Sequence, residues 1–197
     1  MPLPWEESDT SVEWSHPAAL PEEKLLQQCR FGQGRTSGPG GQNRNKVETA
    51  VVLIHEPTEI SAKASERRHM QENKSLAVFR LRLNLATFHR AGMPAGAVGT
   101  PLWRSRLSKP KKPTQPVDPL LRAQQGAILS VNPKHKDYPA LLAEALDTIE
   151  AAGYELKTPA IRLGVSPSQL IKLIRHHPPA IHELNVQREK RGLHSLK

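Results

Sequence analysis

Residues 92–135 constrain the fold of this chain most strongly, because glycine, proline and basic residues replace the periodic apolar residues found on either side. Proline fixes φ and lacks a backbone N–H, so a proline-rich segment favours neither a helix nor a central strand. The stretch from Ser108 to Pro113 adds positive charge. We therefore predict a semi-rigid, basic linker over residues 92–135 that serves as a solvated spacer, a phosphate-binding strap or both.

Residues 20–91, ahead of this linker, are predicted to form a small α+β unit, and residues 1–19 are expected to be a flexible lead. Runs rich in β-branched residues indicate strands, and apolar residues at three- and four-residue spacing indicate one long helix. The predicted elements are a short helix opened by residues 20–23, strands at 29–32, 47–55 and 60–64, and a helix at 66–90. The expected fold class is α+β, a small sheet packed by one long helix.

Residues 136–197 return to helical periodicity and are predicted to form a helical module. Thr158-Pro159 and Ser166-Pro167 are both cap-then-proline signals for helix starts, and Gly164 lies between them. Helix, glycine turn and helix is the helix-turn-helix shape. On this helix-turn-helix-like module, the candidates for phosphate contact are Lys172, Arg175 and His176. The alternative is that these residues form a solvated face without a ligand.

The formal net charge of +9 favours a polyanionic partner, with nucleic acid first and an anionic membrane surface second. No apolar run reaches the ~20 residues that a transmembrane helix needs. Cys29 is the single cysteine, which excludes an intrachain disulfide and a cysteine-based zinc site. The nine histidines lack metal-ligand spacing. We expect no metal, no cofactor and no membrane association, and a monomeric protein of the cytoplasm.

The segment Gly38-Pro39-Gly40-Gly41-Gln42 is a glycine-rich loop that ends in a neutral amide. Adjacent glycines reach φ > 0 without strain and let the main chain approach a target closely. The loop carries no carboxylate, histidine, cysteine or serine triad. Such a tip suits work by backbone donors in a site whose walls belong to another molecule.

The run from Ser37 to Val51, together with the turn His55-Glu56-Pro57-Thr58, resembles the catalytic (GGQ) domain of class I peptide chain release factors. It is also similar to the smaller codon-independent hydrolases that rescue stalled ribosomes. The resemblance covers roughly residues 20–90. Further positions fit the spacing of the family's long helix: Arg68, Asn73, Lys74, Ala77 and Leu81.

The resemblance implies hydrolysis of the peptidyl-tRNA ester in the peptidyl transferase centre of the ribosome, with ribosomal RNA and tRNA supplying the rest of the site. Gly40 and Gly41 would supply the conformation, and Gln42 the N–H that stabilises the oxyanion, a donor worth roughly 10²–10³ in rate. The catalytic residues expected are therefore Gly40, Gly41 and Gln42. The RNA-binding residues expected are Arg44, Asn45, Lys46, Arg67, Arg68, Lys109, Lys111 and Lys112. The alternatives without RNA contact are a turn-stabilising role for Asn45 and a solvated face for Arg44 and Lys46.

The sequence departs from the family pattern at Glu59, where a glycine is usual, and at His69 and Met70, where Ser-Gln is usual. The segment ahead of Gly38 is also too short for a stop-codon-reading domain, so we expect codon-independent release. Two other interpretations stay open. The chain is a helix-turn-helix nucleic-acid regulator with a retired release-factor domain, or it releases peptides on large subunits after splitting.

Overall fold

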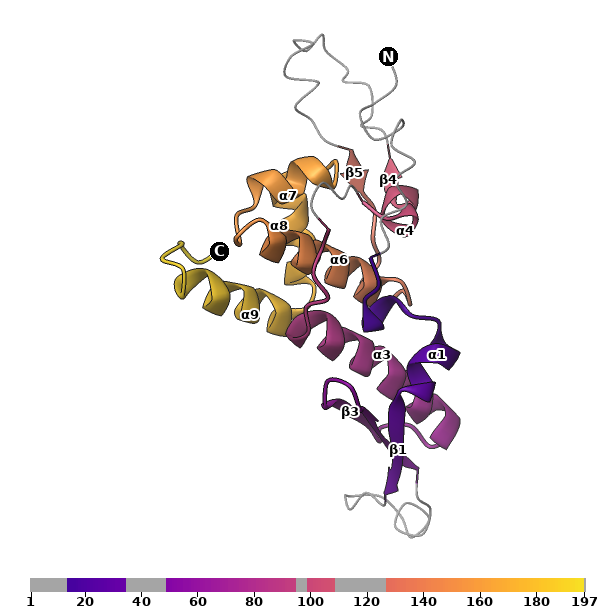
Figure 1. Cartoon of the computed structure of the whole chain (residues 1–197). Helices are drawn as coiled ribbons and strands as arrows, with labels where there is room; N and C mark the ends of the chain where they lie inside the picture. The colour runs from indigo at the N-terminus through magenta and orange to yellow at the C-terminus, as the bar shows by residue number, and fades with distance from the viewer. Residues whose placement is uncertain (1–13, 35–48, 95–98, 109–126, 197) are drawn as a thin grey trace.

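The computed structural model of the protein describes residues 14–34, 49–94, 99–108 and 127–196 (Figure 1). Its described part is α+β, as predicted. The elements are the 3-10 helix η1 (Pro17–Ala19), α1 (Glu22–Gln27), β1 (Cys29–Gly34), β2 (Ala50–His55), β3 (Ile60–Ala64), α3 (Met70–Phe88), α4 (Pro101–Ser105), β4 (Leu107–Ser108), β5 (Ile128–Leu129), α6 (Tyr138–Ala151), α7 (Lys157–Arg162), α8 (Pro167–Arg175) and α9 (Pro178–Glu189). None of the helices described is long and apolar enough to cross a membrane.

The N-terminal unit is an antiparallel sheet of order β1-β2-β3, with α3 packed on one face. Leu53 and Ala62 are paired across the sheet and point to the side that packs against Leu81 and Leu85 of α3. The three predicted strands and the long helix are confirmed. Alternation of buried and exposed side chains along β2 and β3 keeps one face apolar, which is why the sheet accepts a helix there.

The long helix is shorter than its sequence pattern predicted, because side chains compete for the backbone at both ends. At its start, the Asn73 amide bonds both the N–H and the C=O of Arg67, so the helix begins at Met70 rather than Glu66. At its end, the Arg90 guanidinium donates to the carbonyls of Ala86 and Thr87. The helix therefore stops at Phe88, two residues before its predicted end at residue 90.

The C-terminal helices lie against the first unit, with α6 packed beside α3 (Figure 1). The Ser166-Pro167 signal is confirmed, since the Ser166 hydroxyl accepts from the Gln169 N–H at the start of α8. The cap predicted at Thr158 is wrong, because α7 (Lys157–Arg162) begins one residue earlier, after Leu156, and no side chain caps it. Gly164, between the two helices, has a φ of +66°. The helix–glycine turn–helix shape is thus present, while its use in binding nucleic acid stays a prediction.

The linker predicted over residues 92–135 and the flexible lead predicted over residues 1–19 both need correction. Trp103 of α4 is fully buried and its indole N–H donates to the Leu163 carbonyl at 2.9 Å. Strands β4 and β5 pair, so residues 107–108 and 128–129 form a short ladder. In the lead, His16 is also fully buried. Single aromatic side chains with distant partners order these segments, and residues 109–126 lie outside the described part.

One continuous core joins the two predicted units. Buried side chains of the sheet and α3 belong to the same cluster as those of α6, α8 and α9. The β1–β2 hairpin lies at one end of the molecule and the β4–β5 pair at the other, with α3 and α6 between them (Figure 1). The fold therefore places the Gly34–Ala50 end of the first sheet and the β4–β5 ladder at opposite ends of the core.

Candidate functional site

The candidate site lies at the end of the β1–β2 hairpin. Gly34 and Ala50 are the last pair of this ladder, and the glycine-rich loop runs between them. The predicted catalytic and RNA-contacting residues of the loop lie outside the described part of the chain: Gly40, Gly41, Gln42, Arg44, Asn45 and Lys46. Their roles stay predictions, and what the structure describes is the base from which the loop is presented.

Asn73 fixes one arm of that base. Its side chain has no exposed surface, and its Nδ2 donates to the carbonyls of Thr49 at 2.7 Å and Arg67 at 2.9 Å. Its Oδ1 accepts from the Arg67 N–H at 2.9 Å. Thr49 is the residue at which the chain returns from the loop to β2. Asn73 uses both amide hydrogens and its oxygen, so it joins the loop base, the β3–α3 connection and α3 in one rigid junction.

The sequence signal for Asn73 is its place on the buried stripe of the helix. It lies four residues before Ala77, which is followed at the same spacing by Leu81 and Leu85. A polar side chain at such a position needs partners, because an unsatisfied buried amide is costly. The sequence pattern places Asn73 at a position that fits the family's long helix, but gives no role for its amide.

The other arm of the loop base contacts the same helix turn. Gln33, next to the last residue of β1, donates from Nε2 to the Met70 thioether at 3.3 Å. Met70 is one of the residues that departs from the family pattern, and it is 38% exposed. Both arms of the hairpin are thus attached to the first turn of α3.

Arg67 and Arg68 are the two predicted RNA-binding residues that the structure describes. Both are exposed and lie directly beside the Asn73 junction. The acidic neighbour Glu66 is paired with Arg80 at 2.7 Å. The structure therefore brings these arginines to the loop base, whereas Lys109, Lys111 and Lys112 fall outside the described residues.

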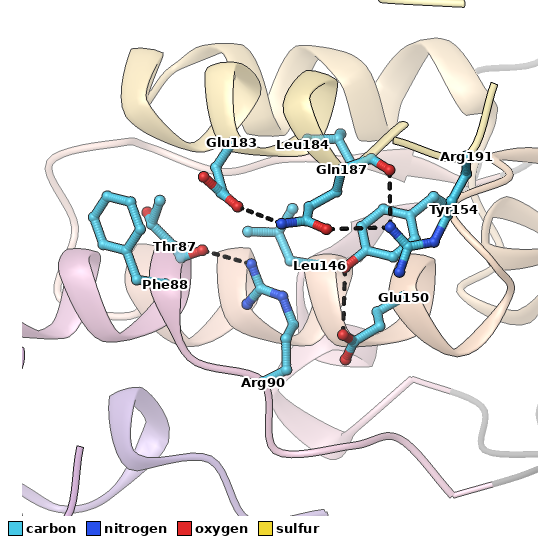
Figure 2. Close-up of a pocket in the computed structure, with 10 residues that line it drawn as sticks. All are labelled: Thr87, Phe88, Arg90, Leu146, Glu150, Tyr154, Glu183, Leu184, Gln187 and Arg191. Atoms are coloured by element: carbon cyan, nitrogen blue, oxygen red, sulfur yellow. Dashed lines mark hydrogen bonds between the residues drawn. The ribbon is translucent and has the colours of Figure 1, made fainter. Parts of the chain in front are cut away.

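A hollow of about 160 Å³ lies elsewhere, between the C-terminal end of α3, α6 and α9 (Figure 2). Its polar groups are already paired: Glu183 accepts from Gln187 at 2.8 Å, and the Arg191 guanidinium lies 4.0 Å from the centroid of the Tyr154 ring. The charges lining it balance, and it is far from the loop base. We therefore place the candidate chemistry at the hairpin, and within the described residues no group of three or more His, Cys, Asp or Glu is arranged to hold a metal ion.

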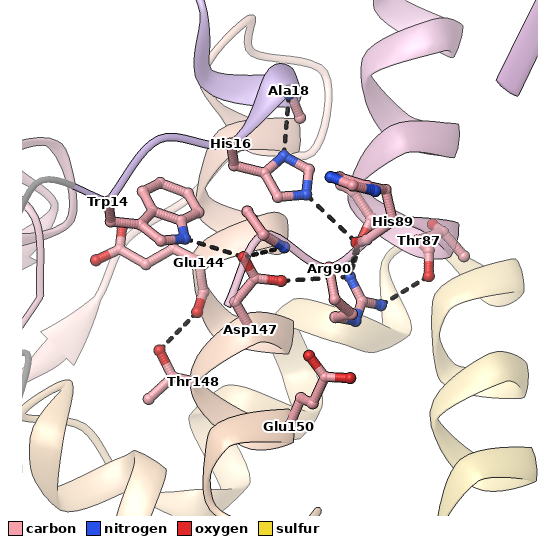
Figure 3. A network of polar contacts seen from close by, with 12 residues as sticks. Trp14, His16, Ala18, Thr87, His89, Arg90, Glu144, Asp147, Thr148 and Glu150 are labelled. Atoms are coloured by element: carbon pink, nitrogen blue, oxygen red, sulfur yellow. Dashed lines mark hydrogen bonds and ion pairs between the residues drawn. The ribbon is translucent and has the colours of Figure 1, made fainter. Parts of the chain in front are cut away.

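Buried carboxylates on α6 attach the segments that join the two parts of the chain (Figure 3). Asp147 accepts from the Trp14 indole at 2.9 Å and from the Ala91 N–H at 3.3 Å, and it lies 3.6 Å from the Arg90 guanidinium. Burial raises the pKa of Asp147. The N-terminal segment and the exit from α3 are thereby held to the same point of α6.

Glu144, one turn earlier, holds the next segment. Its two oxygens accept from the N–H of Thr100 at 2.5 Å and from the Thr100 hydroxyl at 2.7 Å. Thr100 in turn caps α4 by accepting from the Trp103 N–H. Burial raises the pKa of Glu144 to about 7, against the opposing effect of the hydrogen bonds from Thr100. These contacts fix how the hairpin unit sits on the C-terminal helices.

Comparison with known proteins assigns the part of the chain that contains the hairpin. The RF-1 domain family matches residues 26–95, which run from α1 past the end of α3 and include the glycine-rich loop. Residues 26–95 are thus similar to RF-1 domains. The predicted resemblance to release factors is therefore confirmed.

The relatives of this RF-1 domain are peptide chain release factors. The segment is 47% identical over 66 residues to the chloroplastic release factor PrfB1 of Arabidopsis thaliana, which covers 34% of this chain and 14% of the relative. It is 48% identical over 50 residues to peptide chain release factor 1 of Streptococcus mutans, covering 25% of this chain and 14% of the relative. The chain thus spans about one seventh of the length of these curated relatives, and the match is confined to the RF-1 domain.

Proposed function

We propose that this chain hydrolyses the ester that joins a nascent peptide to tRNA, acting on the ribosome without reading a stop codon. The observation that carries the proposal is the RF-1 domain, whose match includes the Gly40-Gly41-Gln42 tip together with its supporting hairpin and helix. Ester hydrolysis passes through an oxyanion, and a preorganised backbone donor stabilises that charge. In this proposal the Gln42 N–H is the donor, and ribosomal RNA and tRNA supply the remaining groups.

The junction at the loop base supports this reaction because a donor stabilises a transition state only when its position is already fixed. Asn73 and the Gln33–Met70 contact attach both arms of the hairpin to α3. The exposed Arg67 and Arg68 lie beside that base, where they would contact RNA phosphates as the tip enters a ribosomal site.

Peptide release by full-length protein tests the reaction. Purified ribosomes carrying peptidyl-tRNA are mixed with wild type, Gln42→Ala or the matched control Gln27→Ala. Gln27 is exposed at the end of α1, near the opposite end of the sheet from the loop. We expect Gln42→Ala to lose release by about 10²-fold or more while still binding ribosomes, and Gln27→Ala to match wild type. Equal release by Gln42→Ala and wild type would refute the proposed chemistry.

The codon-independent part of the proposal draws on the resemblance of the Ser37–Val51 run to the small codon-independent hydrolases. The chain shares the RF-1 domain with its relatives, and its other described residues form helices joined to that domain by one core. Release is compared on ribosomes with an empty A site and on ribosomes presenting a stop codon, with isolated large subunits as a third substrate. Equal release with and without the stop codon is expected. Release that requires the stop codon contradicts codon independence. Release confined to isolated large subunits supports the alternative that the protein acts after the ribosome has split into subunits.

A second candidate function rests on the α7–α8 geometry. The glycine turn and the capped second helix have the helix-turn-helix shape. In this alternative the chain is a nucleic-acid-binding regulator and the RF-1 domain is retired. Sequence-specific binding of duplex DNA by the full chain, together with no peptide release by wild type, would select it.

A further inference from the structure

Helix α8 presents a basic face that the RF-1 domain does not explain. Ser168, Lys172 and Arg175 are exposed, and their spacing of four and three residues places them on one side of the helix. Leu170, Leu173 and Ile174 are buried on the other side. The segment from Lys157 to His182 contains no acidic residue, so its cations have no carboxylate partner within their own helices.

The structure holds this face rigidly from behind. Gln169 accepts from the Leu129 N–H at 2.6 Å and donates to the Ala127 carbonyl at 2.9 Å, which attaches α8 to β5. The Tyr138 hydroxyl donates to the Leu173 carbonyl at 3.0 Å in the interior. A fixed scaffold keeps the cations in place, so little conformational freedom beyond their own side chains is lost when a ligand binds.

The chemistry of the face fits a phosphate backbone. It combines one hydroxyl and two cations, the groups that contact phosphate oxygens in nucleic-acid complexes. It has no exposed large apolar side chain, whereas a helix that binds a membrane surface inserts such residues into the lipid. A polyanion held by hydrogen bonds and charge is therefore the ligand class that matches the residues present.

The position of the face separates it from the glycine-rich loop. The base of the loop lies at the β1–β2 end of the molecule, and α8 lies beyond the other end of α3 (Figure 1). A helix of 19 residues such as α3 is about 28 Å long. The two surfaces would therefore contact different parts of a large partner.

We propose that the face formed by Ser168, Lys172 and Arg175 binds the phosphate backbone of structured ribosomal RNA, as an anchor separate from the glycine-rich loop. The choice of RNA over other polyanions rests on the proposed function, since an enzyme that acts inside the ribosome is surrounded by RNA. The anchor supplies sequence-independent affinity, while the loop supplies the reaction.

The test compares two full-length double variants that remove the same charge. Lys172→Ala/Arg175→Ala alters the face, whereas Lys24→Ala/Lys190→Ala removes two exposed cations from α1 and the end of α9. Binding to protein-free ribosomal RNA and to large subunits is titrated against salt, around ionic strengths of about 0.15 M. Circular dichroism verifies that both variants keep the wild-type fold.

We expect Lys172→Ala/Arg175→Ala to bind about tenfold more weakly and to reduce the slope of log affinity against log salt by about 2. The control should stay near wild type, and Lys172→Arg/Arg175→Lys should restore binding because it keeps both charges. Unchanged affinity and slope in the first variant, or an equal loss in the control, overturns the proposal. Competition by duplex DNA as strong as that by RNA overturns the assignment of RNA.

The binding assay requires no hydrolysis, so its outcome is distinguishable from that of the proposed function. A binding loss specific to the α8 variant supports the anchor even where wild type releases no peptide. In the opposite outcome, peptide release depends on Gln42 but RNA binding is unchanged by substitution of Lys172 and Arg175. That outcome supports the proposed function and contradicts the anchor.

Discussion

The Glu144–Thr100 contact makes a specific prediction about stability and pH. Glu144 is 1% exposed, and burial raises the pKa of its carboxyl to about 7. The folded protein therefore retains this proton to a higher pH than the unfolded chain does. The contribution to stability is present at low pH and is lost as pH rises from the ordinary range of a glutamic acid through about 7.

The magnitude follows from proton linkage. With an unfolded pKa near the usual glutamate value of about 4.3–4.5, the contribution changes by about 2.5 kcal/mol between about pH 5 and about pH 8. Glu144→Gln is neutral at every pH and retains an oxygen that accepts from Thr100. Relative to wild type, the variant should therefore gain about 2.5 kcal/mol of stability across this pH interval.

Urea unfolding at several pH values measures the difference between Glu144→Gln and wild type. The comparison between the two proteins is essential because burial lowers the pKa of His16 to about 4. The contribution of neutral His16 to the stability of the folded protein is therefore lost as pH falls. The opposing pH dependences of His16 and Glu144 partly cancel in wild type, but His16 is common to both proteins. Glu155→Gln, which removes an exposed carboxylate, is the control. A difference between Glu144→Gln and wild type that is constant with pH would refute the reasoning.

Three further substitutions test other parts of the structure. Glu59 has a φ of +57°, so Glu59→Gly should raise the free energy of unfolding by about 0.5–1 kcal/mol in urea titrations, and a loss would contradict strain at this turn. Asn73→Ala leaves the Thr49 carbonyl without its hydrogen-bond donor. It should lower the free energy of unfolding by about 2–4 kcal/mol in the same assay and should also lower peptide release. Wild-type values for both measurements would contradict a positioning role for Asn73. Trp103→Phe keeps most of the ring but loses the hydrogen bond to Leu163, so thermal and urea unfolding should show a loss of about 1–3 kcal/mol, and an unchanged midpoint would count against that bond.

The sequence was a good guide where structure depends on local pattern. The strands, the long helix and the start of α8 follow from alternation, periodicity and a cap-then-proline pair. Thr100-Pro101 is the same signal at the start of α4, but the surrounding glycines and prolines favoured a linker there. Trp103 has no periodic apolar neighbours, so its burial depends on Leu163, which is distant in sequence.

In the candidate site, too, local patterns are predictable from the sequence and contacts between distant residues are not. Gly40, Gly41 and Gln42 are identifiable from the motif and its flanks, because they are consecutive. The support beneath them is not, since Asn73 joins segments that are 6 and 24 residues away along the chain. Only the folded arrangement shows which carbonyls its amide reaches.

The core shared by α3 and α6 has a consequence for how the molecule unfolds. Buried side chains of the RF-1 domain and of the C-terminal helices belong to one cluster, so neither part can open without exposing the apolar surface of the other. The described part should therefore unfold as one cooperative unit, and a fragment ending near residue 95 should not keep the wild-type order. An incompletely synthesised chain would then lack the ordered junction at Asn73 from which the glycine-rich loop leaves the sheet.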